Sequence, residues 1–238
     1  MTAEQTPLER QQLELIDASA HTFWHWVRFD IVTAVAEAQG ATQIADIGAG
    51  SGMLGDRLAD THPAFTYRFD ELSPALDAAL ASRWGQSARL NDDERLGVDT
   101  VAAMLDVIEH IENDVEALGA WHDRMDSGAH LVVTVPALQW GFSQWDTDLG
   151  HYRRYSRTSL RAALESSGFE VERCDYLFPE LLPLLVKRKL SSASGGDADM
   201  PVLSDRINRV GHLLSGATSR LRKVWPAGTS VVAVARRR

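Results

Sequence analysis

A glycine-rich turn follows the first apolar segment of the chain. Asp46, Gly48, Gly50 and Gly52 form the pattern D-x-G-x-G-x-G at the end of the run TQIADI. Glycine lets a backbone turn sharply and approach a ligand without interference from a Cβ atom. The free N–H groups at the start of a following helix can bind a carboxylate or phosphate. The dinucleotide fingerprint G-x-G-x-x-G would need a glycine where Met53 stands, so this pattern disfavours a nicotinamide site.

A pair of acidic residues lies about 20 residues beyond this turn, a spacing typical of ribose-binding sites. Asp70 and Glu71 end the run FTYRFDE, and Ser73 and Pro74 then start a predicted helix. A carboxylate at this position can accept hydrogen bonds from both hydroxyls of a ribose, in a dinucleotide or in an adenosyl ligand. The alternative is a solvated acidic pair at the end of a strand.

Two histidines are candidates for proton transfer near neutral pH, which histidine performs best. His110 follows the apolar run over 98–106, and His151 lies in an aromatic segment further along the chain. We expect both to line a substrate pocket, with Tyr152 and Tyr155 beside them. The alternatives are equally simple: His110 caps a helix, and His151 packs on a neighbouring aromatic ring.

A second pair of histidines has a spacing that can hold a metal. His21 and His25 lie four residues apart on a predicted helix, but the sequence shows no third ligand nearby. We therefore predict no metal site and interpret this aromatic helix as a lid. Cys174, the single cysteine, lies in a predicted strand without an adjacent motif, so we interpret it as a buried structural thiol.

Strands and helices alternate along the chain, which predicts a doubly wound, mostly parallel sheet. A helix over 8–39, broken near Ser19 and closed by Gly40, comes first. Apolar or β-branched runs then predict strands, separated by helix-sized segments. These runs are TQIADI, FTYRFDE (65–71), VDTVAAMLD (98–106), AHLVVTVPA (129–137), FEVERCDY (169–176) and TSVVAVAR (229–236).

Two segments interrupt the alternation, and insertions in α/β folds usually build the substrate side. Residues 138–156 contain Trp140, Phe142 and Trp145 without a clear period, which we interpret as a wall of the substrate pocket. Arg153 and Arg154 then either bind an anionic substrate group or form surface ion pairs. Residues 177–227 contain an apolar stretch, the linker SSASGGDAD and an amphipathic helix over 203–224.

Charge is distributed unevenly along the 238 residues, whose net charge is −9. From Lys187 to the end there are 11 basic and 3 acidic residues. Either this part meets an anionic partner, or it is a solvated basic face on a C-terminal helix. The acidic chain as a whole is a poor match for nucleic acid. No apolar run reaches the length of a membrane span, and the polar start does not resemble a signal peptide. With one cysteine, a cytoplasmic location is expected.

The motif LDVIEHIEND (105–114) after the run over 98–106 gives the chain its resemblance to a family. Together with ADIGAGSG, FDELSP and HLVVTVP, it resembles the class I S-adenosylmethionine-dependent methyltransferases over nearly the whole chain. The match is closer to a bacterial branch often found among envelope and polysaccharide genes. That branch carries segments like HTFWHWVRFD, VPALQWGFSQWDTDLGHYRRYSRTSLRAALESSGFEV and PAGTSVVAVAR.

The resemblance implies a single Rossmann-like domain and a cofactor. The fold would be a seven-stranded, mostly parallel sheet with an antiparallel last strand. Residues 1–40 would form a helical lid, 41–137 the cofactor-binding core, and 138–156 and 177–227 the substrate-side insertions. The cofactor would be S-adenosyl-L-methionine, and the implied contacts are Asp46, Gly48, Ala49, Gly50, Gly52, Glu71, Leu72, Leu105 and Asp106. The contact to the adenine amine would fall among Asn91, Asp92 and Asp93, with Asp92 as the candidate.

The function implied is methyl transfer to a small molecule or a lipid-linked saccharide by in-line displacement. His110, His151 and Tyr152 are the candidate catalytic residues. The helix over 203–224 would either rest on an anionic membrane, at its inner face, or pack its leucine and isoleucine face onto the sheet. The alternatives are a non-catalytic protein that binds an adenosyl ligand, or a partner subunit, and, with least support, a nicotinamide-dependent oxidoreductase.

Overall fold

The computed structural model describes residues 9–10, 12–14, 22–190 and 203–238. Six strands in this part of the chain form one sheet in the order β2-β1-β3-β4-β6-β5. The strands from β1 to β4 pair in parallel, and β6 lies antiparallel between β4 and β5. The predicted doubly wound sheet with an antiparallel last strand is confirmed. The strands are β1 (Gln43–Ile47), β2 (Thr66–Asp70), β3 (Thr100–Leu105), β4 (His130–Pro136), β5 (Phe169–Leu177) and β6 (Ser230–Arg237).

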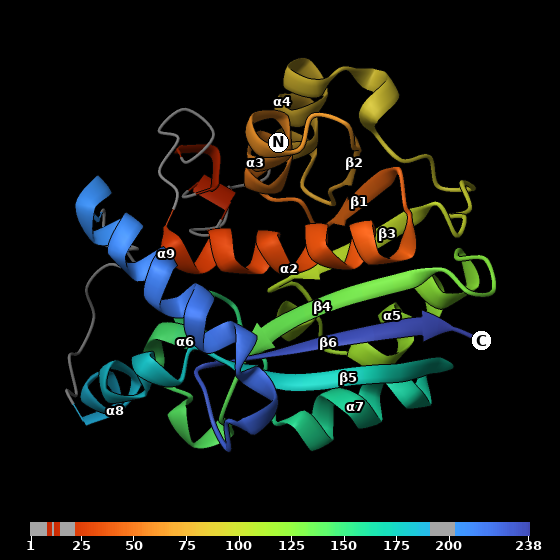
Figure 1. The fold of residues 1–238 in the computed structure, drawn as a ribbon. Coiled ribbons are helices and arrows are strands. Elements are labelled where there is room, and N and C mark those ends of the chain that lie inside the picture. Colours follow the sequence, from red (N-terminus) through yellow and green to blue (C-terminus); the bar gives the residue numbers. More distant parts are fainter. Residues whose placement is uncertain (1–8, 11, 15–21, 191–202) are drawn as a thin grey trace, which may run out of the picture.

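Helices cover both faces of the sheet (Figure 1). One face packs against α2 (Phe23–Gln39), α3 (Met53–Thr61) and α4 (Pro74–Trp84). The other packs against α5 (Asp114–Asp123) and α7 (Arg157–Ser166). The two insertions contain α6 (Gln144–Asp148), α8 (Leu182–Leu190) and α9 (Asp205–Arg220).

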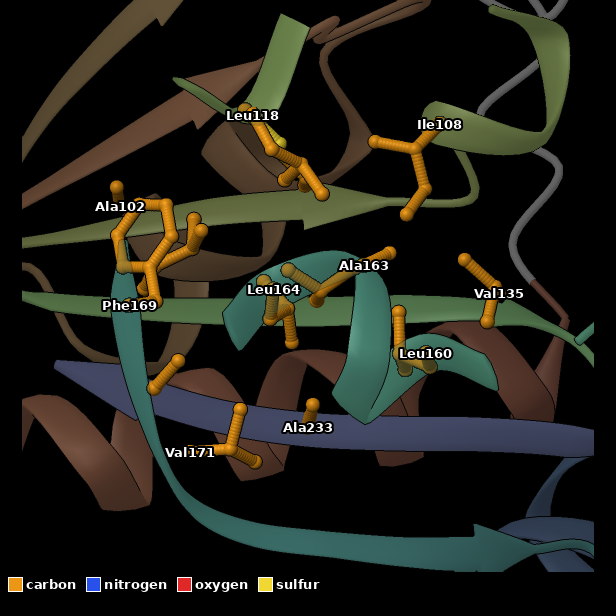
Figure 2. Packing of buried hydrophobic residues seen from close by; sticks show 14 of the residues in the cluster. Ala102, Ile108, Leu118, Val135, Leu160, Ala163, Leu164, Phe169, Val171 and Ala233 are labelled. Carbon is orange, nitrogen blue, oxygen red and sulfur yellow. The ribbon is translucent and has the colours of Figure 1, made fainter. Parts of the chain in front are cut away.

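Successive side chains of a strand point to opposite faces of the sheet, so each strand contributes to the apolar core on both faces. In β3, Ala102 and Met104 face the α5 and α7 side, whereas Val101 and Ala103 face the α2 side. Figure 2 shows Leu160 and Leu164 of α7 directed at the first of these two faces. Both faces of each central strand are buried, so its sequence is a continuous apolar run, as expected for a parallel sheet.

The seventh strand predicted from the resemblance is reduced to one bridge. Phe69 of β2 pairs in parallel with Arg89 alone, and the Leu90 N–H donates to the Phe69 carbonyl at 2.8 Å. Gly85 turns the chain just before this bridge with a φ of 87°. Asn91 begins a polar run, N-D-D, just after it. Turn-forming residues on both sides leave too few extended residues for a strand.

The helix predicted over 8–39 corresponds to two described parts. Residues 9–10 and 12–14 are helical, and α2 begins at Phe23. Gly40 ends α2 in the left-handed conformation with a φ of 65°, as predicted. The α2 side chains Val27 and Val32 are buried in the core, so this helix is also a structural layer. Residues 15–21, including His21, and the linker SSASGGDAD lie outside the described residues.

Helix α9 crosses α2 (Figure 1), and the residues that it buries are polar: Asn208, Ser215 and Ser219. Asn208 is buried and accepts a hydrogen bond from the Phe23 N–H at 3.1 Å. His212 contacts Asp30 of α2 at 2.7 Å. The apolar side chains of α9 are therefore left on the surface, and the expectation that they pack onto the sheet is wrong. The exposed ones are Ile207, Val210, Leu213 and Leu214. Within the described ranges, no helix combines the length and apolarity that crossing a bilayer requires.

Candidate active site

The glycine loop between β1 and α3 has a backbone that only glycine adopts easily. Gly48, Gly50 and Gly52 have φ values of 69°, 56° and 74°. A Cβ atom on Gly48 would lie 2.9 Å from a methyl carbon of Val107, so the loop also approaches the segment after β3 closely. The loop lies where β1 and β3 are neighbours and the strand order reverses, which is where doubly wound sheets bind ligands.

The Glu71 carboxylate is held against this loop by two backbone groups. One oxygen accepts from the Gly50 N–H at 2.8 Å, and the other accepts from the Ser73 N–H at 2.9 Å. A carboxylate oxygen can accept more than one hydrogen bond, so acceptor capacity remains for ligand hydroxyls. Leu72 lies beside it with 85% of its surface exposed, open to an adenine ring.

The N-terminal helical residues reach the same loop. The side-chain oxygen of Gln12 accepts from the Ser51 N–H at 3.0 Å. The Ser73 hydroxyl donates a hydrogen bond to the Glu9 carboxylate. Both contacts bring this segment to the residues that would hold a cofactor, which agrees with its interpretation as a lid.

Asp46 lies beneath the loop at the end of β1. Its carboxylate is almost completely buried and accepts a hydrogen bond from the Tyr67 hydroxyl at 3.0 Å. Burial raises its pKa to about 7, although the hydrogen bond from Tyr67 opposes this shift. The contact of Asp46 with a cofactor stays a prediction; in this structure the partner of its carboxylate is the Tyr67 hydroxyl of β2.

Asp92 lies on an exposed turn beyond β2. The neighbouring Asn91 N–H donates to Glu94, which in turn contacts Arg68 at 2.7 Å. The structure leaves the choice among the three residues of this turn as open as the sequence does.

The backbone at the end of β3 is strained at Asp106, whose φ is 58°. Its carboxylate pairs with Arg28 of α2 at 2.8 Å and accepts from the Thr134 hydroxyl at 3.3 Å. Leu105, the preceding residue, is half-buried against the α2 side of the core. Sequence reasoning missed Arg28, although it lies in the quoted segment HTFWHWVRFD.

His110 and His151 come together although they belong to separate segments. Their ring centroids are 4.6 Å apart with an edge-to-face geometry. Burial, and next the charge of His151, lower the pKa of His110 to about 4, so its ring is neutral near pH 7. This juxtaposition agrees with a shared role at one site. Sequence reasoning missed their buried neighbour Glu109, which lies in the quoted motif LDVIEHIEND.

The aromatic insertion holds His151 through buried charges. Asp146 accepts from Arg154 at 2.7 and 3.0 Å, and His151 Nδ1 lies 3.0 Å from the same carboxylate. Arg153 pairs with Asp114 at 3.0 Å. Of the two alternatives for these arginines, the structure therefore favours ion pairs, which for Arg154 are buried within the insertion.

The tyrosines of the insertion have different environments. Tyr152 is exposed, and its backbone N–H donates to the carbonyl of Glu109 at 2.8 Å. Tyr155 is buried and donates to Asp114 at 2.6 Å, so it supports the site from behind. Trp145 lies 6.0 Å from the His151 ring, and Arg188 lies over its other side at 4.3 Å.

Comparison with known proteins identifies the family. Residues 23–173 match the family model described as a methyltransferase domain. The chain belongs to this family. It is a class I S-adenosylmethionine-dependent methyltransferase, as the sequence motifs predicted, and neither the non-catalytic nor the nicotinamide alternative is supported by this match. No protein of curated function matches the chain.

Solved structures share the fold of this methyltransferase at low identity. One is a chain of the complex between the Haloferax volcanii Trm112 methyltransferase activator and a candidate methyltransferase. It has a TM-score of 0.60 and 13% identity, and the match covers 98% of this chain and 99% of that chain. Another is a SAM-dependent methyltransferase from Archaeoglobus fulgidus, with a TM-score of 0.52 and 14% identity over 90% of this chain and 94% of that chain. A third is Haemonchus contortus phosphoethanolamine N-methyltransferase 2 in complex with S-adenosyl-L-methionine. Its TM-score is 0.52 and its identity is 15%, and the match covers 87% of this chain and 52% of that chain.

The residues of this methyltransferase fit its cofactor. The loop backbone needs glycine where a side chain would collide, and the Glu71 carboxylate retains acceptor capacity beside it. S-adenosylmethionine supplies a methyl group on a positively charged sulfur. Methyl transfer needs no strong leaving-group assistance, so the protein's part is to orient the acceptor and to exclude water.

Proposed function

We propose that this methyltransferase acts on a hydroxyl or amine of a small molecule or lipid-linked saccharide at an anionic membrane surface. The observation that carries the membrane part of this proposal is the outward apolar face of α9. Leu213 is 75% exposed and Val210 is 60% exposed, although burying such side chains is normally favourable. An exposed apolar patch of this kind is typical of a protein or membrane contact.

The charges around this face favour a membrane over a neutral partner. Arg206, Arg209, Arg220 and Lys223 are exposed on α9 and in the turn after it. A helix that combines exposed leucines with basic side chains is typical of segments that lie in the interface of anionic membranes. A lipid-linked acceptor would then be presented to an enzyme that rests on the same surface.

The acceptor would lie near His110 and His151 at the carboxyl edge of β3. A neutral His110 ring can accept a hydrogen bond from an acceptor hydroxyl and orient its oxygen. S-adenosylmethionine, held by the glycine loop and Glu71, would supply the methyl group and leave as S-adenosylhomocysteine with the electron pair of the broken carbon–sulfur bond. The acceptor oxygen, oriented by His110, would form the new bond to carbon, and its proton would leave to solvent. Tyr152, exposed beside these histidines, would contact the acceptor.

The cofactor part is tested by calorimetric titration with S-adenosylhomocysteine, with NAD as the comparator and Asp46→Ala as the control variant. We expect micromolar binding of S-adenosylhomocysteine, no binding of NAD, and loss of binding in the variant. Absence of S-adenosylhomocysteine binding would contradict the proposed site. Incubation with labelled cofactor and bacterial lipid extracts then searches for the methylated acceptor.

The membrane part is tested by flotation with vesicles of phosphatidylcholine alone or mixed with phosphatidylglycerol. We expect flotation with the anionic vesicles, weakened by salt and by Val210→Asp. Val98→Asp is the matched control, because Val98 is 59% exposed but lies away from α9. Equal absence of flotation with both vesicle types, or an equal effect of the two variants, would overturn the membrane part alone.

A further inference from the structure

We propose that Glu109, His110 and His151 form a binding site for one divalent transition-metal ion. One potential ligand atom from each of the three residues lies within 4.8 Å of the other two. Glu109 and His110 come from the short turn after β3, and His151 comes from the end of the aromatic insertion. Two elements that are distant in the sequence therefore bring three donor groups to one point at the carboxyl edge of the sheet.

The environment of the Glu109 side chain is the observation that points to a bound ligand. Its side chain is completely buried, and neither carboxylate oxygen has a hydrogen-bond partner among the described residues. A buried carboxylate is normally paired or bound to a metal, because its desolvation is otherwise costly. The nearby arginines, Arg28 and Arg154, are already engaged with Asp106 and Asp146.

The two histidines are oriented as metal-binding histidines usually are. His151 Nδ1 contacts the Asp146 carboxylate at 3.0 Å, which leaves Nε2 available to an ion. The His110 ring interacts with the backbone of Leu149 and Gly150. Ligating histidines typically use their second nitrogen in this way, and such contacts fix the ring orientation. Asp146 is itself held by the two hydrogen bonds from Arg154, so it is a positioning residue.

The donor set indicates which ions are suitable. One carboxylate and two imidazoles suit Zn²⁺, Mn²⁺, Fe²⁺ or Co²⁺ better than Mg²⁺ or Ca²⁺, which prefer oxygen ligands. Three protein ligands also leave positions open for water or a substrate oxygen. An ion here would hold the acceptor oxygen in place of the hydrogen bond to His110, and would lower the pKa of the acceptor hydroxyl. This role rests on the proposed function, whereas binding of the ion does not.

The test measures metal binding directly on tag-free, chelator-treated protein. Equilibrium dialysis against Zn²⁺ gives the stoichiometry, and titration with Co²⁺ reports ligand geometry through its visible absorption. We expect one equivalent per chain at micromolar metal. Glu109→Gln and His151→Ala should each weaken binding at least ~10-fold, the range found when ligands or their supports are removed. His62→Ala is the matched control, since His62 ends α3 and lies 3.8 Å from Glu37 of α2, and it should not change binding.

Binding of S-adenosylhomocysteine to the same variants separates this inference from the proposed function. Retained cofactor binding with lost Co²⁺ absorption supports the metal site and shows that the variants fold. Less than one equivalent of Zn²⁺ bound by the wild type, or an unchanged Co²⁺ titration in Glu109→Gln, would overturn it. Failure of the wild type to bind S-adenosylhomocysteine while it binds Co²⁺ would overturn the proposed function and leave the metal site standing. If Glu109→Gln unfolds, His110→Ala with the same two readouts replaces it.

Discussion

Arg28 of α2 and Asp106 at the end of β3 form an ion pair, with 2.8 Å between Nη1 and Oδ2. Asp106 has a φ of 58°, a conformation that aspartate tolerates better than most residues but still at some cost. Arg28 is also hydrogen-bonded to Ser230 of β6 at 3.0 Å. One guanidinium therefore joins α2 to the segment after β3 and to the start of β6.

Replacing Arg28 should destabilise the protein, because Asp106 would keep its charge without an oppositely charged partner. We expect Arg28→Met to lower the free energy of unfolding by about 2 kcal/mol, measured by urea denaturation. Arg161→Met is the matched control, since its pair with Glu165 is exposed and should contribute less than about 1 kcal/mol. Equal losses of stability in the two variants would show that the buried pair stabilises the protein no more than the exposed pair does.

Glu71 should control cofactor affinity. Glu71→Gln keeps one acceptor oxygen but loses the charge and the second acceptor, so the Ser73 N–H or a ligand hydroxyl loses its partner. We expect the affinity for S-adenosylhomocysteine to fall about 10-fold or more, a loss of ~1.4 kcal/mol or more, by calorimetry. Glu116→Gln, an exposed change on α5, should bind like the wild type. An unchanged affinity in Glu71→Gln would remove Glu71 from the site.

Asp46 should make stability depend on pH. Its pKa in the folded protein is about 7, above the ordinary value of 3.8, so the folded state holds a proton that the unfolded state has lost between these values. The contribution of this group to stability therefore falls as pH rises from about 4 to about 7. Asparagine does not titrate. The free energy of unfolding of Asp46→Asn minus that of the wild type should therefore be about 2 kcal/mol larger at pH 8 than at pH 5.

Urea denaturation at both pH values measures this difference for Asp46→Asn. Asp123→Asn serves as the control, because the Asp123 side chain is 83% exposed. Its substitution should change the free energy of unfolding by the same amount at both pH values. A pH-independent difference for Asp46→Asn would mean that Asp46 is ionised throughout.

Cys174 should react slowly in the folded protein. It is the one cysteine of the chain, it is buried, and burial raises its pKa to about 11. The thiolate is the reactive form, so thiol reagents at pH 8 should modify the native protein at least ~100-fold more slowly than the protein in urea. Time courses with an absorbing disulfide reagent measure both rates. Comparable rates would show that β5 opens readily around this residue.

The sequence alone was sufficient for the sheet, the glycine loop and the family. Periods of apolar residues and a glycine pattern are local properties, so the strands after Gly40 and the loop at Gly48 could be predicted within a few residues. The seventh strand could not, because its loss depends on turn-forming residues that compete with pairing to β2.

Only the tertiary structure decided what the polar groups contact. Asn208 and His212 of α9 contact Phe23 and Asp30 of α2, so the apolar face of α9 lies on the surface. Arg28 of α2 pairs with Asp106 after β3, and packing brings the rings of His110 and His151 together. Such pairings follow from how the layers pack, and the cost of leaving a buried charge without a partner selects among them. The motif LDVIEHIEND contains Glu109 next to His110, but only the packing shows that the Glu109 side chain is completely buried beside the two histidines.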